Sequence, residues 1–127
     1  SDDREFVEHL RKQGDLGWQL VRATSLREWF DCLASARVLV SGRFHHTIAA
    51  CCLGVPAVVL GSNTPKMQAV AETFGLEPPL SYATPDLAEV LVHCTEQALE
   101  AGPSDPSIVE AVCHRAERNF DGLRRLT

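Results

Sequence analysis

The sequence lacks an excess of positive charge. Its 127 residues hold 12 Lys and Arg against 17 Asp and Glu, which gives a net charge of −5 and a pI of about 5.5. The basic residues are scattered, apart from the pair Arg124-Arg125 near the end of the chain. Because broad nucleic-acid binding needs a basic face, we expect no nucleic-acid partner.

The sequence also lacks a long apolar run. The longest apolar stretch, residues 48–60, is interrupted by Gly54 and Pro56 and is shorter than the roughly 20 residues that cross a bilayer. No charged segment followed by an apolar one opens the chain, as it would in a signal peptide. We therefore expect a cytoplasmic protein without membrane insertion, and we interpret the first residues as a cut from a longer chain.

No C-x-x-C motif occurs, and the five cysteines are odd in number. Each lies in an apolar helical pattern, which predicts mostly buried free thiols in a reducing compartment. A zinc site needs spaced ligands, whereas His93-Cys94 and Cys113-His114 are adjacent pairs that diverge on a helix. We expect no metal and no other cofactor.

What the chain does contain is enough apolar sequence, 45% of residues, for one core in a single domain covering residues 1–127. Helical periodicity, capping patterns and apolar runs predict alternating helices and strands. The predicted helices are 3–13, 26–33, 44–53, 65–74, 85–101 and 107–126. The predicted strands are 18–23, 37–40 and 57–60, with a weaker extended segment at 80–82.

Alternation of this kind predicts an α/β domain with a parallel sheet and right-handed crossovers. We expect a Rossmann-like, three-layer domain with a small, mostly parallel sheet of three or four strands. Since complete doubly wound domains have more strands, we expect that one or two strands belong to sequence upstream of this chain, which would make it a fragment of a longer protein. An exposed sheet edge would favour pairing with a second copy of the chain.

Two turns follow the carboxyl ends of predicted strands, where parallel sheets bind ligands. One is Ser41–His46 and the other is Gly61–Lys66. A helix begins in each, and the first turn of a helix carries unpaired amide groups and partial positive charge. Glycine permits close backbone approach, and an arginine offers a planar fork for carboxylate or phosphate. The residues we expect to bind such an anion are Gly42, Arg43, Asn63 and Lys66.

Ordinary structural roles compete with these assignments. Arg43 is also consistent with a surface arginine paired with an acid, and Lys66 with a solvated lysine. His45 is consistent with a helix-start residue bonded to a carbonyl. His46 is expected to point elsewhere, because neighbours on a helix diverge.

The stretch from Leu26 to Leu76 resembles the C-terminal part of the polysaccharide pyruvyl transferase family. The family shows Arg-Leu-His at a helix start, a small-residue helix, Gly-Val-Pro, and a later lysine before a helix that ends in Gly-Leu. The chain differs in having phenylalanine for leucine, a histidine where a small residue is usual, and no tyrosine before the lysine. The matching segments are Arg43-Phe44-His45, Thr47–Ala50, Gly54-Val55-Pro56, Lys66 and Gly75-Leu76.

This resemblance implies one half of a glycosyltransferase-B-like enzyme that transfers pyruvyl from phosphoenolpyruvate to a cell-surface glycan as a ketal. It implies that this half binds phosphoenolpyruvate, or another phosphate-bearing donor, and that His45 is the catalytic general acid. The glycan acceptor would bind a missing domain, so we expect the isolated chain to be inactive. The alternatives are the nucleotide-sugar-binding half of a glycosyltransferase and a non-catalytic binding or assembly module of the same fold.

Overall fold

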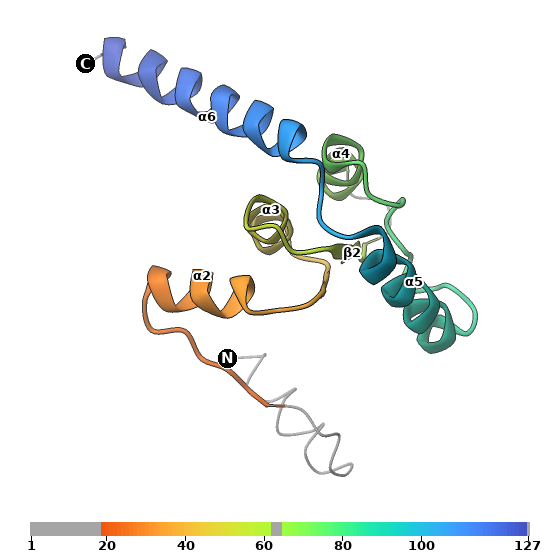
Figure 1. Cartoon of the computed structure of the whole chain (residues 1–127). Helices are drawn as coiled ribbons and strands as arrows, with labels where there is room; N and C mark the ends of the chain where they lie inside the picture. The colour runs from red at the N-terminus through yellow and green to blue at the C-terminus, as the bar shows by residue number, and fades with distance from the viewer. Residues whose placement is uncertain (1–18, 62–64, 127) are drawn as a thin grey trace.

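The computed structural model describes residues 19–61 and 65–126, with side chains described as far as residue 118. Five helices and two strands occur in these ranges (Figure 1). In chain order they are α2 (Leu26–Ala34), β1 (Leu39–Ser41), α3 (Phe44–Cys52), β2 (Ala57–Val59), α4 (Pro65–Phe74), α5 (Leu87–Ala101) and α6 (Pro106–Leu126).

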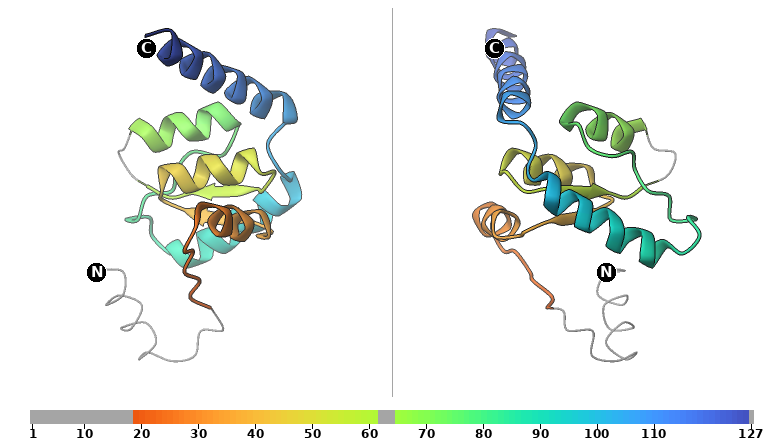
Figure 2. Two further views of the ribbon diagram at one scale, coloured as in Figure 1. Left: turned by 90° about the vertical axis from the view of Figure 1, so that its left-hand side faces the viewer. Right: turned by 45° about the vertical axis from the view of Figure 1, so that its right-hand side comes forward.

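The two strands form a parallel pair in which Leu39 lies opposite Ala57 and Ser41 opposite Val59. Side chains alternate between the faces of a strand, so these four residues share one face. That face packs against α3 and α4, whereas Val58 points to the other face, where α5 lies. Helices therefore cover both sides of the strands, as the view in Figure 2 shows.

The core lies between the strands, α3 and α4. Small residues allow α3 to lie close to the sheet, and Ala50 and Cys51 are completely buried. Phe74, at the end of α4, is 3% exposed and packs in the same cluster as Cys51 and Ala57. Gly54 follows α3 with a φ of 80°, a conformation that glycine adopts without steric cost, and it turns the chain back toward β2.

The α/β class and the parallel pairing are confirmed, but the predicted count of three or four strands is wrong for the described residues. The predicted strand at 18–23 is absent from residues 19–23, which have no regular structure and are exposed. Among the described residues, no strand lies beside residues 19–23 to pair with them. The predicted helix at 3–13 and residue Trp18 lie outside the described residues.

The extended segment predicted near Leu80 is reduced to one parallel bridge between Leu80 and Leu60. Leu80 N–H donates to the carbonyl of Val59, and Gly61 N–H donates to the carbonyl of Leu80, both at 2.9 Å. Pro78 and Pro79 precede this bridge, and proline has no amide hydrogen to extend a ladder. The prolines therefore stop the third strand before it begins.

Helix ends agree with the sequence patterns in most places. Ser25 caps α2 by accepting a hydrogen bond from the Glu28 amide at 3.1 Å, as the capping pattern predicts. The prediction that α5 begins at Pro85 is wrong, because the helix begins at Leu87. Asp86 has a φ of 54° there, so the left-handed turn before Leu87 interrupts the helix that Pro85 would start.

The prediction of mostly buried thiols is also wrong, although all five cysteines are free. Cys51 is buried, Cys52 and Cys94 are half-buried, and Cys32 and Cys113 are exposed. The helices that carry the exposed thiols contact the rest of the molecule along one side only. Within the described part of the chain, no helix combines the length and apolar character needed to cross a membrane.

Candidate anion-binding site

The site begins where β1 ends and α3 starts. Ser41 is buried, and its Oγ accepts a hydrogen bond from the Arg43 amide at 2.9 Å. Arg43 is the N-cap residue of α3 and has extended backbone angles, φ −102° and ψ 127°. Its carbonyl accepts bonds from the amide and the hydroxyl of Thr47, at 3.1 and 2.8 Å. The backbone of this turn is therefore fixed from both sides.

The amide groups of Phe44, His45 and His46 form the first turn of α3. No residue four positions earlier in this helix accepts from them, because the intrahelical bonds begin with Thr47. The Arg43 side chain makes no capping hydrogen bond, and the first turn holds no acidic residue. This turn consequently presents N–H donors and the positive end of a helix dipole to an anion.

Three basic residues lie at or near this turn. Arg43 and His45 are exposed at the start of α3, and Lys66 is exposed in the first turn of α4. The Lys66 Nζ lies 5.8 Å from the centre of the Phe44 ring. The structure thus brings together residues that the sequence placed in two separate turns, 23 positions apart between Arg43 and Lys66.

Phe44 joins the site to the core. Its half-buried ring packs against the buried clusters around Cys51 and around Met67. The His45 ring stands edge-on to it, with the ring centres 5.2 Å apart. Phenylalanine in place of the family's leucine therefore anchors α3 against α4 and supports both Lys66 and His45.

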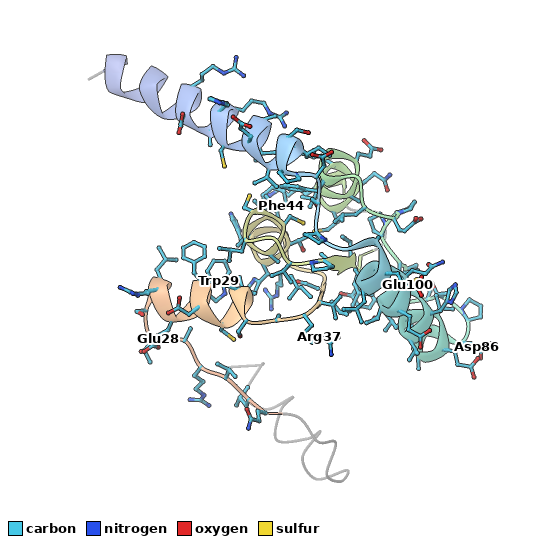
Figure 3. All side chains as sticks on the ribbon, in the orientation of Figure 1. Glu28, Trp29, Arg37, Phe44, Asp86 and Glu100 are labelled. Atoms are coloured by element: carbon cyan, nitrogen blue, oxygen red, sulfur yellow. The ribbon has the colours of Figure 1, made fainter. Side chains whose placement is uncertain are left out.

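His46 turns away from these residues toward α2, as the sequence predicted. Its Nε2 accepts a hydrogen bond from Trp29 Nε1 at 3.1 Å, and the two rings meet edge-on with centres 5.0 Å apart. Figure 3 shows Trp29 on the side of α2 that faces α3. Burial lowers the pKa of His46 below its ordinary value, and the charges of Arg43 and His45 lower that pKa further. The hydrogen bond from Trp29 to His46 joins α2 to α3.

Gly42 has a close neighbour within the chain. A Cβ built on it would overlap the Tyr82 hydroxyl and would lie 3.3 Å from the Leu60 carbonyl oxygen. A side chain at position 42 would therefore displace the Tyr82 side chain and press on the Leu60 carbonyl, whether or not a ligand approaches. Sequence reasoning did not place Tyr82 at this site, because the contact spans 40 positions and only the weak extended pattern at 80–82 gave a signal.

Asn63, the remaining predicted binding residue, lies outside the described residues. Among the residues that are described, no three or more His, Cys, Asp and Glu side chains gather as a metal site would require. The groups that lie at or near the start of α3 are instead a guanidinium, an ammonium, an imidazole and the amides of the first turn.

Comparison with known protein families shows to which family the chain belongs. A sequence model of the family described as polysaccharide pyruvyl transferase matches residues 1–64, half of the chain. The chain belongs to the polysaccharide pyruvyl transferase family. No curated protein and no solved structure matches it. The match to the pyruvyl transferase model contains β1, α3 and β2 with Arg43 and His45, and it ends before Lys66.

Proposed function

We propose that the first turn of α3 binds phosphoenolpyruvate, and that this chain is the donor-binding half of a polysaccharide pyruvyl transferase. The observation that carries the proposal is that Arg43 and His45 lie at the N-terminus of α3 and that Lys66 Nζ, from α4, lies 5.8 Å from the centre of the Phe44 ring in the same turn. Family membership supplies the class of reaction. The arrangement of the larger enzyme as a glycosyltransferase-B-like pair of domains belongs to the same proposal.

The chemistry of the donor matches the side chains. Phosphoenolpyruvate carries a phosphate and a carboxylate, and a guanidinium binds either group through two parallel hydrogen bonds. Lys66 supplies a second positive charge as a point charge, and the α3 amides supply further donors. Arg43 and Lys66 come from different helices, so two anionic groups of one donor molecule have separate partners.

His45 takes the role of general acid in this proposal. It gives a proton to the terminal carbon of the enol, which becomes a methyl group. One sugar hydroxyl then adds to the central carbon, phosphate leaves, and a second hydroxyl adds to complete the ketal. The two hydroxyl protons balance the proton on the new methyl group and the proton taken up by the released phosphate.

The acceptor glycan binds elsewhere in this account. The described residues offer one cationic site for a donor, and the sugar hydroxyls come from an acceptor held by another part of a longer protein. The isolated chain therefore binds the donor without turning it over. We place this reaction in the cytoplasm, where a glycan precursor is modified before export.

A thermal-shift and calorimetric screen tests the function. Phosphoenolpyruvate should stabilise the chain more than inorganic phosphate does, because it adds a carboxylate for the second cation. Preferential stabilisation by a nucleoside diphosphate sugar would instead indicate the donor half of a glycosyltransferase. The absence of stabilisation by all three would indicate a non-catalytic member of the family and would contradict the proposal.

The role of His45 is tested in the complete enzyme with the acceptor present. His45→Gln should lower kcat by about 10²–10⁴ while changing phosphoenolpyruvate binding little. His93→Gln is the matched control, because His93 is exposed on α5 and belongs to neither of the helices α3 and α4 that form the site. Normal turnover by His45→Gln would remove His45 from the reaction.

A further inference from the structure

A cavity of about 320 Å³ lies beside β2. Its walls come from β2, from the segment Gly75–Leu80, from the second half of α5 and from the start of α6. No residue of β1 or of the α3 turn lines it, so it is separate from the anion site. Figure 1 shows β2 between α3 and α5.

The backbone of β2 points polar groups toward this cavity. In the parallel pair, Pro56 carbonyl and Leu60 amide bond to β1, so with this register Val58 also directs its amide and carbonyl to β1. Ala57 and Val59 therefore direct theirs to the opposite edge. The bond from Leu80 to the Val59 carbonyl confirms this direction.

Three of these edge groups lack partners in the described part of the chain. They are the amide and carbonyl of Ala57 and the amide of Val59, for which no hydrogen bond is found. Ala57 is 7% exposed and Val59 is 2% exposed. Unpaired buried backbone groups cost free energy, and nearly all such groups in proteins have a partner.

Pro78 explains why the chain does not supply that partner. The Leu60–Leu80 bridge puts position 78 opposite Val58. A residue there would donate its amide hydrogen to the Ala57 carbonyl and accept from the Val59 amide, but proline has no amide hydrogen. The ladder is interrupted at the position where the cavity opens.

We propose that this cavity binds a small, neutral, planar heterocycle through a cis-amide edge, the pattern shared by lactams and nucleobases. Such an edge carries one N–H donor for the Ala57 carbonyl and one neighbouring acceptor for the Val59 amide. The cavity volume is at the lower end of the range for small-molecule pockets. Phe74, Leu76 and Ile108 provide apolar walls for the faces of a ring.

The size of the open edge favours this occupant over a peptide strand. Leu80 already occupies the next position along β2, so the free edge accommodates one amide unit. Asp105 at the rim accepts hydrogen bonds from the amide and hydroxyl of Ser107, both at 2.8 Å. A carboxylate at the rim disfavours an anionic ligand, which distinguishes this site from the α3 turn.

The direct test is an amide-resolved NMR titration of the full chain with 2-pyridone, which carries the proposed donor and acceptor. The Val59 amide resonance should shift downfield and saturate. N-methyl-2-pyridone keeps the ring and the acceptor but carries a methyl group in place of the donor hydrogen, and it should bind at least about tenfold more weakly. Equal binding of the two compounds, or no saturable change at Val59, would overturn the proposal.

Two pairs of variants separate the cavity from non-specific binding. Ala98→Leu fills the cavity wall and should weaken 2-pyridone binding by about tenfold or more, whereas Ala88→Leu, exposed on the same helix and outside the cavity, should stay within about twofold. Pro78→Ala restores the missing amide, lets the chain pair with Ala57 and should compete with the ligand. Pro79→Ala is its control, because in this register its nitrogen points away from β2.

Either variant pair suffices if a member of the other fails to fold. Unchanged binding by a folded Ala98→Leu, or equal binding by folded Pro78→Ala and Pro79→Ala, would place the ligand outside this cavity and would overturn the proposal.

Discussion

Helices α3 and α5 cover opposite faces of the same two strands and differ in how much they bury. Four of the nine residues of α3 are buried, whereas none of the fifteen residues of α5 is. On the α5 side Val40 is 40% exposed and the cavity remains open. The face under α3 and α4 therefore holds the core of the fold and supports the candidate site, whereas the face under α5 is loosely covered.

Thiol reactivity provides the largest expected contrast between the two sides. Burial raises the pKa of Cys51 in α3 to about 11 from an ordinary value of 9.0, which lowers its thiolate fraction about a hundredfold near neutral pH. Cys51 should therefore react with iodoacetamide at least about a hundredfold more slowly than an exposed thiol such as Cys113. Mass-spectrometric peptide mapping over time measures this, and similar rates would contradict the burial of Cys51.

Matched valine substitutions compare packing on the two faces. Val70 on α4 is 4% exposed and Val92 on α5 is 60% exposed. Val70→Ala should lower the free energy of unfolding by about 2 kcal/mol, since it removes two buried carbon atoms and leaves a cavity. Val92→Ala should change it by less than about 0.5 kcal/mol. Equal losses in urea denaturation would show that the two faces are equally packed.

A smaller effect is expected from the hydrogen bond that fixes the Arg43 carbonyl. Thr47 is completely buried, and its hydroxyl donates to that carbonyl at 2.8 Å. Thr47→Val keeps the shape and removes the donor, so it should cost about 1 kcal/mol of stability. Thr73→Val, exposed on α4, is the control. If the two variants unfold at the same denaturant concentration, the bond does not stabilise the turn.

The smallest expected effect is a dependence on pH at the contact between α2 and α3. The pKa of His46 is lowered in the folded chain from 6.5, so the unfolded chain binds a proton first as pH falls. Stability should therefore decrease as pH falls through about 6.5, and it should level off below the folded pKa. His46→Gln keeps an acceptor for the Trp29 N–H but removes the titrating group. The part of the pH dependence of stability that comes from His46 should therefore disappear in this variant. An unchanged slope in pH-dependent denaturation would exclude His46 as its source.

Local patterns in the sequence were sufficient to predict the parts of the fold that depend on neighbouring residues. The capping pattern at Ser25, the start of α3 at Phe44 and the glycine after it all follow from short-range geometry. The strand near Leu80 was over-predicted. Pro78 interrupts the ladder because it lies opposite Val58, and the sequence does not reveal which residues of two distant segments lie opposite each other. The same applies to the predicted strand at 18–23, which lacks a partner.

Some contacts around the candidate site could not be predicted from the sequence, for a similar reason. Arg43 and His45 are close in sequence, and adjacent parallel strands gave a geometric reason to add Lys66. The contacts of Trp29 with His46 and of Tyr82 with Gly42 join residues 17 and 40 positions apart. Such contacts depend on how helices pack in three dimensions, and no local pattern indicates them.

The most direct test of the account is a calorimetric titration of phosphoenolpyruvate into the chain and two arginine variants. Arg43→Lys should weaken binding by about ten- to a hundredfold, because lysine keeps the charge and loses the two-pronged contact, which is worth roughly 1.5–3 kcal/mol. Arg37→Lys, an exposed substitution before β1, should bind like the unaltered chain. If Arg43→Lys binds phosphoenolpyruvate normally, the first turn of α3 is not the donor site and the central claim is wrong.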